Sequence, residues 1–274
     1  MKKRMFAFDL DGTLLNDSKQ ISRATIAALE EMVEKGVIIA LASGRIASSM
    51  KQFLPQLSMD VALLTLNGAA VFLDARNGHK CIYNITLDHK YTEELICHWK
   101  GKPFALNFYT PDHLYTVTTE LTRSWIELYQ QQTNSKYQFI DDFDFLAGTD
   151  PSKIIFVGDE SEISRQEQLF REEWGGSNIY ICRTWHHYLE FLNPKANKLL
   201  GIEALAGAYG VDLSDVVAFG DAENDIPMLS GAGLGIAMKN SSEKVKSSAK
   251  RETEYTNDDD GVAREWDRLK KELF

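Results

Sequence analysis

Two short acidic motifs contain residues suited to metal-assisted chemistry, and each follows an apolar run typical of a buried strand. The first contains Asp9 and Asp11, and the second contains Asp221, Asn224 and Asp225. Neighbouring carboxylates at the end of a buried strand repel each other unless a cation neutralises them. Carboxylate and carbonyl oxygens are the ligands that Mg²⁺ prefers. The two motifs therefore predict a cation site if the fold brings them together, whereas separately each is also compatible with a turn or a helix cap.

Two further positions are suited to holding a phosphate. Ser43 and Gly44 follow an apolar run and precede a helical pattern, where a hydroxyl and free backbone N–H groups bind anions. Lys198 follows Asn197 at the expected start of another helix and is placed to supply a fixed positive charge. Taken alone, Ser43 is more simply explained as a helix cap and Lys198 as a solvated lysine.

The elements that must position these residues alternate between strand and helix in the outer parts of the chain. The first 75 residues contain expected strands at Met5–Leu10, Val37–Ala42 and Val61–Leu66, separated by helical patterns. Strands joined in this way form right-handed βαβ units in a parallel sheet, whose carboxyl edge binds ligands. The alternation returns later with a helix at Leu199–Tyr209, strands at Val216–Phe219 and Leu234–Met238, and a helix at Gly261–Leu273.

The middle of the chain has a different pattern, with hairpins and turn signals between helices. Phe104–Tyr109 is expected to pair with Leu114–Val117, and Asn67-Gly68 and Asn77-Gly78 indicate turns. Strands are also expected at Ile154–Val157, Ile179–Cys182 and Tyr188–Leu192, and helices at Thr92–Trp99 and Leu121–Gln131. We predict an α/β fold in which residues 1–80 and 188–274 form a doubly wound, Rossmann-like core and residues 81–187 form an inserted α+β domain.

Composition excludes several classes of protein. The 274 residues are 44% hydrophobic, which is enough for a buried core and excludes general disorder. The net charge of −10, without a basic stripe, disfavours a nucleic-acid partner. The three cysteines are widely spaced and form neither a disulfide framework nor a zinc site. No apolar run reaches the length of a membrane span, so we expect no membrane association and a cytoplasmic location.

In this order and spacing the four motifs resemble those of the haloacid dehalogenase superfamily. The resemblance covers nearly the whole chain and is closest to the Cof-type bacterial phosphatases, which carry a large α/β cap between the second and third motifs. It includes Gly235-Ile236-Ala237-Met238 and Asp260-Gly261-Val262-Ala263. Ser43 stands where threonine is common, and the region before Lys198 lacks the usual glycines, so Lys195 is an alternative for the motif lysine.

The resemblance implies a Mg²⁺-dependent phosphatase that acts on a small phosphorylated metabolite, such as a sugar phosphate. Asp9 would be the nucleophile and Asp11 the general acid and base. Mg²⁺ would be bound by Asp9, the backbone carbonyl of Asp11, and Asp221, with Asp225 in a supporting role. The phosphate would be held by Leu10, Ser43, Gly44, Lys198 and Asn224, and candidates for substrate specificity in the cap are Arg183, Thr184 and His186.

Other functions share these motifs. A phosphotransferase or phosphomutase on the same scaffold uses the same four motifs, so both stay open. A non-catalytic phosphate-binding regulatory module is a further alternative, although no structural need brings Asp9, Asp11 and Asp221 together. The sequence predicts neither the individual substrate nor the oligomeric state.

Overall fold

A computed structural model describes residues 3–75 and 80–274 of the chain and divides it into two compact units. The core unit comprises Met1–Arg45, Met50–Tyr83 and Asn197–Phe274. The inserted unit comprises Asn84–Ala196 together with the short segment Ile46–Ser49. The core is therefore built from both ends of the chain, as the returning strand and helix pattern predicts.

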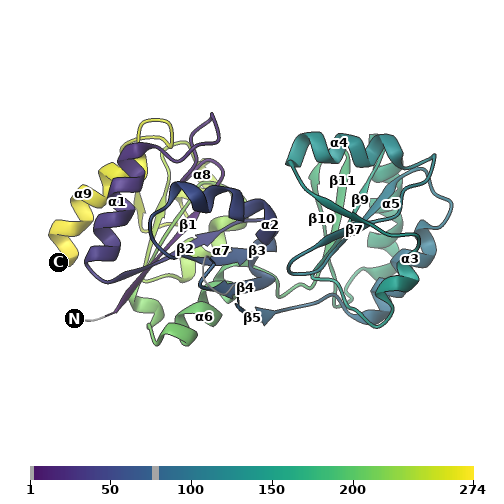
Figure 1. The fold of residues 1–274 in the computed structure, drawn as a ribbon, viewed down its shortest axis with the longest axis horizontal. Helices are drawn as coiled ribbons and strands as arrows, with labels where there is room; N and C mark the ends of the chain where they lie inside the picture. The colour runs from purple at the N-terminus through teal and green to yellow at the C-terminus, as the bar shows by residue number, and fades with distance from the viewer. Residues whose placement is uncertain (1–2, 76–79) are drawn as a thin grey trace. The chain divides into compact units, whose positions relative to one another are not determined.

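The described part of the core unit contains an eight-stranded sheet (Figure 1). In spatial order its strands are β14 (Arg251–Glu252), β13 (Leu234–Ala237), β12 (Val216–Gly220), β1 (Arg4–Asp9), β2 (Val37–Ala42), β3 (Ala62–Thr65), β4 (Ala70–Leu73) and β5 (Lys80–Asn84). The strands from β14 to β3 are parallel, whereas β4 runs antiparallel to β3. The parallel part confirms the expected doubly wound core, and the antiparallel β4 was not predicted.

The helices are divided between the two units. In sequence order they are α1 (Arg23–Glu34), α2 (Ala47–Met50), α3 (His89–Trp99), α4 (Arg123–Thr133), α5 (Glu160–Trp174), α6 (Lys198–Tyr209), α7 (Ile226–Gly231), α8 (Glu243–Lys246) and α9 (Gly261–Leu273). Of these, α3, α4 and α5 belong to the inserted unit. Ser22 caps α1 by accepting a bond from the Thr25 N–H, as its position before the apolar pattern predicts.

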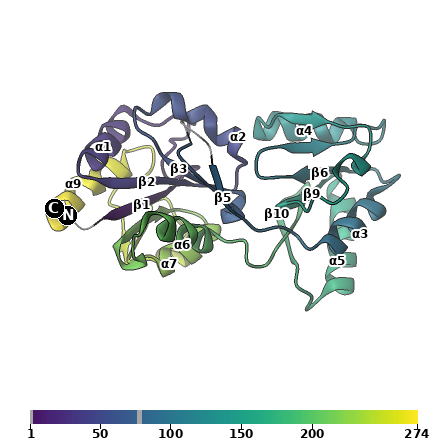
Figure 2. The same ribbon diagram turned by 60° about the horizontal axis from the view of Figure 1, so that its bottom comes forward.

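Side-chain alternation along β1 explains why the core sheet is covered on both faces. Met5 and Ala7 pack in the cluster that includes α6 and α7, whereas Phe6 faces the other way and contacts Trp266 of α9 at 5.9 Å between ring centroids. Successive strand residues point to opposite faces, so a strand covered on both sides is apolar throughout. Figure 2 shows α6 and α7 on the opposite face of the sheet from α1 and α9.

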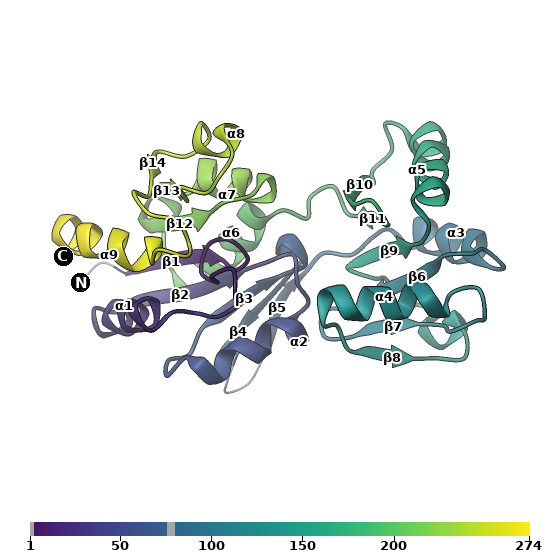
Figure 3. The same ribbon diagram turned by 90° about the horizontal axis from the view of Figure 1, so that it is seen from above.

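The inserted unit has its own six-stranded sheet among the described residues. Its order is β10 (Tyr180–Trp185), β11 (Tyr188–Leu192), β9 (Lys153–Val157), β6 (Ala105–Tyr109), β7 (Leu114–Thr116) and β8 (Tyr137–Phe139). Figure 3 shows the strands of the inserted sheet following one another in this order. Every pairing is antiparallel except β7 with β8, and β6 pairs with β7 as the turn signal predicts.

Alternation along β6 again separates two layers. Leu106 and Phe108 pack with α3 and α5, whereas the Tyr109 hydroxyl meets that of Tyr129 on α4. The face under α4 also buries an ion pair between Lys153 and Glu190, with 3.1 Å between Nζ and Oε2. The inserted unit therefore has an aromatic core on one face of its sheet and a buried polar layer on the other.

The predicted domain boundaries need correction. We expected the core to resume at residue 188, but Tyr188–Leu192 pairs with β9 and β10 and so belongs to the inserted unit, which ends at Ala196. The first boundary lies after Tyr83 rather than at residue 80, because Lys80–Asn84 extends the core sheet. The turn expected at Asn77-Gly78 lies outside the described residues. No helix in the described ranges is both long and apolar enough to cross a membrane.

Two glycines with left-handed backbones allow a matched test of the core. Gly68 has φ +87°, and a Cβ there would lie 2.2 Å from the backbone oxygen of Asn197, which caps α6. Gly36 has φ +79° but open space around it. We expect Gly36→Ala to lower the free energy of unfolding by about 1 kcal/mol through backbone strain alone. Gly68→Ala should cost at least about 3 kcal/mol, since overpacking adds to the same strain.

Urea unfolding followed by circular dichroism measures both costs. Equal losses in the two variants would contradict close packing of Gly68 against the start of α6.

Candidate active site

The predicted site residues meet at the carboxyl edge of the core sheet. Asp9 is the last residue of β1 and is 6% exposed, and its neighbours β2 and β12 end at Ala42 and Gly220. All three strands are parallel, so the residues that follow them emerge at one edge. Ser43 and Asp221 are the next residues after β2 and β12.

A buried lysine connects the first and last motifs. Lys198 opens α6, and its side chain has no solvent exposure. Its Nζ lies 2.6 Å from Oδ1 of Asp9 and 2.5 Å from Oδ1 of Asp225. Asn197 fixes this position because its side chain accepts a bond from the Leu200 N–H. The geometry places Lys198 in the acidic cluster, while Lys195 is exposed three residues earlier.

Both carboxylate oxygens of Asp225 accept hydrogen bonds. Its Oδ2 accepts bonds from the backbone N–H groups of Asp221 and Ala222, both at 2.9 Å, while its Oδ1 receives Lys198. Both oxygens are therefore engaged. The carboxylate is fully buried, so these bonds compensate for its lost hydration.

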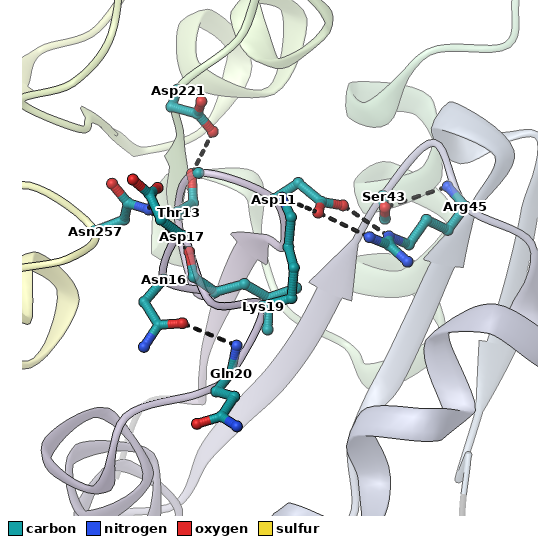
Figure 4. A network of polar contacts seen from close by, with 12 residues as sticks. Asp11, Thr13, Asn16, Asp17, Lys19, Gln20, Ser43, Arg45, Asp221 and Asn257 are labelled. Atoms are coloured by element: carbon teal, nitrogen blue, oxygen red, sulfur yellow. Dashed lines mark hydrogen bonds and ion pairs between the residues drawn. The ribbon is translucent and has the colours of Figure 1, made fainter. Parts of the chain in front are cut away.

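Three carboxylates lie close enough to share one cation. Oxygens of Asp9, Asp221 and Asp225 lie within 4.8 Å of one another. Lys198 forms ion pairs with Asp9 and Asp225, so the three ionised carboxylates together would carry excess negative charge in a buried setting. Asp221 has a further bond at 2.8 Å from the Thr13 hydroxyl to its Oδ1, drawn in Figure 4. This donor set fits a hard divalent cation such as Mg²⁺.

The pKa values record this crowding. Burial raises the pKa of Asp221 to about 6, although the Thr13 hydroxyl opposes the rise. Burial also raises the pKa of Asp9 well above its ordinary range; Lys198 opposes that rise, and the carboxylates of Asp225 and Asp221 add to it. Burial would lower the pKa of Lys198, but Asp9 and Asp225 outweigh burial and raise it, so the ammonium stays charged.

Asp11 has a different environment from Asp9. Figure 4 shows its carboxylate turned toward Arg45, whose Nε and Nη2 donate bonds of 2.7 and 2.8 Å. Lys19 adds a bond at 3.0 Å. Burial would raise the pKa of Asp11, but the bonds from Arg45 and Lys19 outweigh burial and lower it. The arrangement stabilises Asp11 as a carboxylate.

The loop after β2 and the loop after β12 are joined through Asn67. The side-chain amide of Asn224 donates to Oδ1 of Asn67 at 3.0 Å. A Cβ on Gly44 would lie 3.1 Å from the same oxygen, so the Gly44 backbone passes close to it. Ser43 is 3% exposed, and its hydroxyl accepts a bond from the Arg45 N–H. Gly44 and Asn224, two predicted phosphate-binding residues, thus approach one side chain.

The three predicted specificity residues belong to the inserted unit and are bonded within it. Arg183 donates to the Ser164 hydroxyl at 2.7 Å and to the backbone oxygen of His186 at 2.5 Å. Thr184 donates to Glu190 at 2.7 Å and thereby joins the buried ion pair of the inserted sheet. His186 contacts Glu160 at 3.1 Å, but its side chain is 73% exposed.

Sequence reasoning missed four residues of the site. Thr13, Lys19, Arg45 and Asn67 all bond to predicted site residues or their loops, yet none was given a role. Thr13 lies two residues after Asp11 and Arg45 directly follows Gly44, so position was an available signal for them. Lys19 offers no local signal, because only the folded loop brings it to Asp11.

Comparison with known proteins places this chain in a large group of similar sequences. The model of the haloacid dehalogenase-like hydrolase family matches residues 6–265. The HMP-PP phosphatase of Cronobacter sakazakii is 30% identical over 241 residues, covering 86% of this chain and 84% of that protein. The 5-amino-6-(5-phospho-D-ribitylamino)uracil phosphatase of Bacillus subtilis is 26% identical over 273 residues, covering 96% of each.

Solved structures have the same fold. A haloacid dehalogenase-like hydrolase from Bacteroides thetaiotaomicron superimposes with a TM-score of 0.85 at 26% identity. The match covers 98% of this chain and all of that one. The similarity therefore includes the inserted unit as well as the core.

The raised pKa of Asp221 predicts how stability depends on pH without metal. The folded protein binds the Asp221 proton more tightly than the unfolded chain, in which the pKa is near 3.8. The contribution of Asp221 to the free energy of unfolding should therefore fall as pH rises from about 4 to about 7, because ionisation of this group disfavours the folded state. Asp221→Asn should reduce this fall, since the amide does not ionise. Mg²⁺ at pH 7.5 should stabilise the wild type far more than the variant.

Urea unfolding in a chelator at pH 4.5 and 7.5 tests this expectation. An identical pH dependence in both proteins would contradict the crowded-carboxylate account.

Proposed function

This chain belongs to the haloacid dehalogenase-like hydrolases, and on that premise we propose that it is a Mg²⁺-dependent phosphatase with Asp9 as nucleophile. The observation that carries the proposal is the buried contact of Lys198 with Asp9 and Asp225, next to Asp221. A fold alone does not require such a costly cluster, because buried charges must be paired and hydrogen-bonded. Two similar proteins are named as phosphatases of small metabolites.

The metal would be held by Asp9, Asp221 and the backbone carbonyl of Asp11. Asp225 is less suited to direct ligation because both its oxygens already accept bonds. We assign it instead to holding Lys198 and the Asp221 backbone. Mg²⁺ bound there would supply positive charge that lowers the repulsion between the Asp9 carboxylate and the phosphate.

In the first half-reaction, a carboxylate oxygen of Asp9 attacks phosphorus, and the bond from phosphorus to the ester oxygen breaks. The ester oxygen leaves with a proton from Asp11, and an aspartyl-phosphate forms at Asp9. In the second half-reaction, water attacks the same phosphorus and gives a proton to Asp11. The bond to Asp9 then breaks, which releases inorganic phosphate and restores both residues.

The structure sets a condition on this proton transfer. Asp11 accepts bonds from Arg45 and Lys19, which favour its ionised form. We infer that these cations must loosen their contacts before Asp11 carries the proton that the leaving oxygen receives. The contacts favour Asp11 as the base of the second half-reaction.

The phosphate oxygens would be met by donors around the same edge. We assign this role to Lys198, the Ser43 hydroxyl, the backbone N–H groups of Leu10 and Gly44, and Asn224. The proximity of Gly44 and Asn224 to Asn67 supports their joint use. Fixed donors stabilise charge that grows on the equatorial oxygens during phosphoryl transfer.

The substrate class we propose is a small phosphorylated metabolite, a sugar phosphate or a similar monoester. The two similar phosphatases are named for HMP-PP and for 5-amino-6-(5-phospho-D-ribitylamino)uracil, which supports this class. All three specificity candidates bond within the inserted unit, and we favour His186 because its side chain is still 73% exposed. The cytoplasmic location stays a prediction from the sequence.

Replacing the nucleophile tests the mechanism. Asp9→Asn keeps nearly the same volume but cannot form an acyl phosphate, so turnover of a phosphomonoester panel with Mg²⁺ should be lost. Far-UV circular dichroism should stay as in the wild type.

A chelator should abolish wild-type turnover, and excess Ca²⁺ should suppress it because Ca²⁺ prefers a looser, higher coordination.

Near-wild-type hydrolysis by purified Asp9→Asn would overturn the role of Asp9. Full wild-type activity in chelator, with elemental analysis finding no metal, would overturn the metal requirement.

The two lysines before and at the start of α6 give a matched pair. Lys198→Ala removes the cation between Asp9 and Asp225, so we expect kcat to fall about 10²–10³-fold. It should also destabilise the fold by about 3 kcal/mol or more, because buried carboxylates lose their partner. Lys195→Ala alters an exposed side chain and should change stability by at most about 0.5 kcal/mol.

Steady-state kinetics and urea unfolding of both variants under identical Mg²⁺ decide the assignment. A larger loss of kcat in Lys195→Ala than in Lys198→Ala would show that the assignment to Lys198 is wrong.

A further inference from the structure

The loop that carries Asp11 is tied to two asparagines from distant parts of the chain. Nδ2 of Asn240, after β13, donates to the backbone oxygen of Gly12 at 2.8 Å. Nδ2 of Asn257, between β14 and α9, donates to the backbone oxygen of Leu15 at 3.0 Å. Figure 4 shows Asn257 beside the same loop, near Asp17. None of the four catalytic motifs contains either asparagine.

The two asparagines are also bonded to each other, which fixes the orientation of the first. The backbone N–H of Asn257 donates to Oδ1 of Asn240 at 3.2 Å. Since that oxygen is used as an acceptor, the other end of the amide presents its N–H to Gly12. Asn257 therefore supports the loop directly at Leu15 and indirectly through Asn240.

The anchored carbonyls stand on either side of Thr13, which bonds to the metal-side carboxylate. The Thr13 hydroxyl donates to Oδ1 of Asp221 at 2.8 Å. Gly12 approaches Asp221 so closely that a Cβ on this glycine would lie 2.4 Å from Oδ2. A shift of the Gly12 carbonyl would therefore change both the hydrogen bond from Thr13 to Asp221 and the packing of Gly12 against that carboxylate.

We propose that Asn240 and Asn257 are positioning residues that set the orientation of Asp221 for divalent-cation binding, acting through Gly12 and Thr13. This inference rests on the proposed metal-dependent function. It extends the site to two loops beyond the four motifs, so that residues after β13 and β14 help to define the metal site at β12.

If Asn240 had a purely structural role, its removal would lower global stability and leave the affinity for Mg²⁺ unchanged. Asn240 is exposed and fills no core space, so its removal should leave global stability within about 0.5 kcal/mol. Groups that orient metal ligands typically change metal affinity about 10–100-fold when they are removed. Metal affinity therefore separates positioning from folding.

The test is a calorimetric titration of the full-length, metal-free protein with Mg²⁺. We expect the dissociation constant for Mg²⁺ to rise about tenfold in Asn240→Ala, which removes the donor without adding a charge. Asn257→Ala should act in the same direction. Ser230→Ala is the matched control, because Ser230 on α7 also makes a side-chain bond to a backbone carbonyl, that of Ser248.

A double-mutant cycle tests the route. If Asn240 acts through Thr13, Thr13→Val and Asn240→Ala should be non-additive in their effect on Mg²⁺ affinity. Additive effects would overturn the proposed route through Thr13.

The outcomes separate this inference from the proposed function. Wild-type binding of Mg²⁺ with unchanged affinity in the Asn240 and Asn257 variants, measured with folded protein, would overturn the inference alone. Failure of the wild type to bind Mg²⁺ or to hydrolyse phosphomonoesters would overturn the proposed function itself. An equal loss of affinity in Ser230→Ala would assign the effect to general loosening of the core and would also contradict the inference.

Discussion

The ammonium group of Lys198, buried between the carboxylates of Asp9 and Asp225, is the interaction on which the rest of the structure depends. Removing three charges from water is unfavourable unless they are closely paired. The end of β1, the start of α6 and the turn after β12 must therefore meet at one point. Adjacent parallel pairing of β12 with β1 satisfies this requirement. With Asp221 beside them, the carboxylates outnumber the lysine, which leaves a place for a cation.

The same constraint explains where an insertion is tolerated. The chain leaves the core after Tyr83 and returns at Asn197, directly before Lys198. Asn197 caps α6, and its backbone lies against Gly68, so the returning chain is fixed at its first core residue. The inserted unit has its own sheet and hydrophobic core. The geometry of this sheet edge therefore depends on where the chain returns to the core.

Much of the site could be predicted because it depends on local sequence. Parallel strands end at one edge, so acidic residues after buried strands were expected to converge, and the cap at Asn197 favoured Lys198 over Lys195. The contact of Arg45 with Asp11 joins residues 34 positions apart and depends on side-chain direction, which periodicity does not encode. The end of the inserted unit at Ala196 was predicted too early, because the apolar strand Tyr188–Leu192 is compatible with either sheet.

Reductive trapping of the phosphoryl-enzyme tests the central claim most directly. Wild-type protein is mixed with excess p-nitrophenyl phosphate and Mg²⁺, treated with borohydride and cleaved with trypsin, and the peptide Met5–Lys19 is sequenced by mass spectrometry. Borohydride reduces an acyl phosphate to an alcohol, so a phosphorylated aspartate becomes homoserine. The account predicts homoserine at position 9, dependent on both substrate and Mg²⁺. Homoserine at position 11 instead, or at neither position while substrate is hydrolysed, would contradict it.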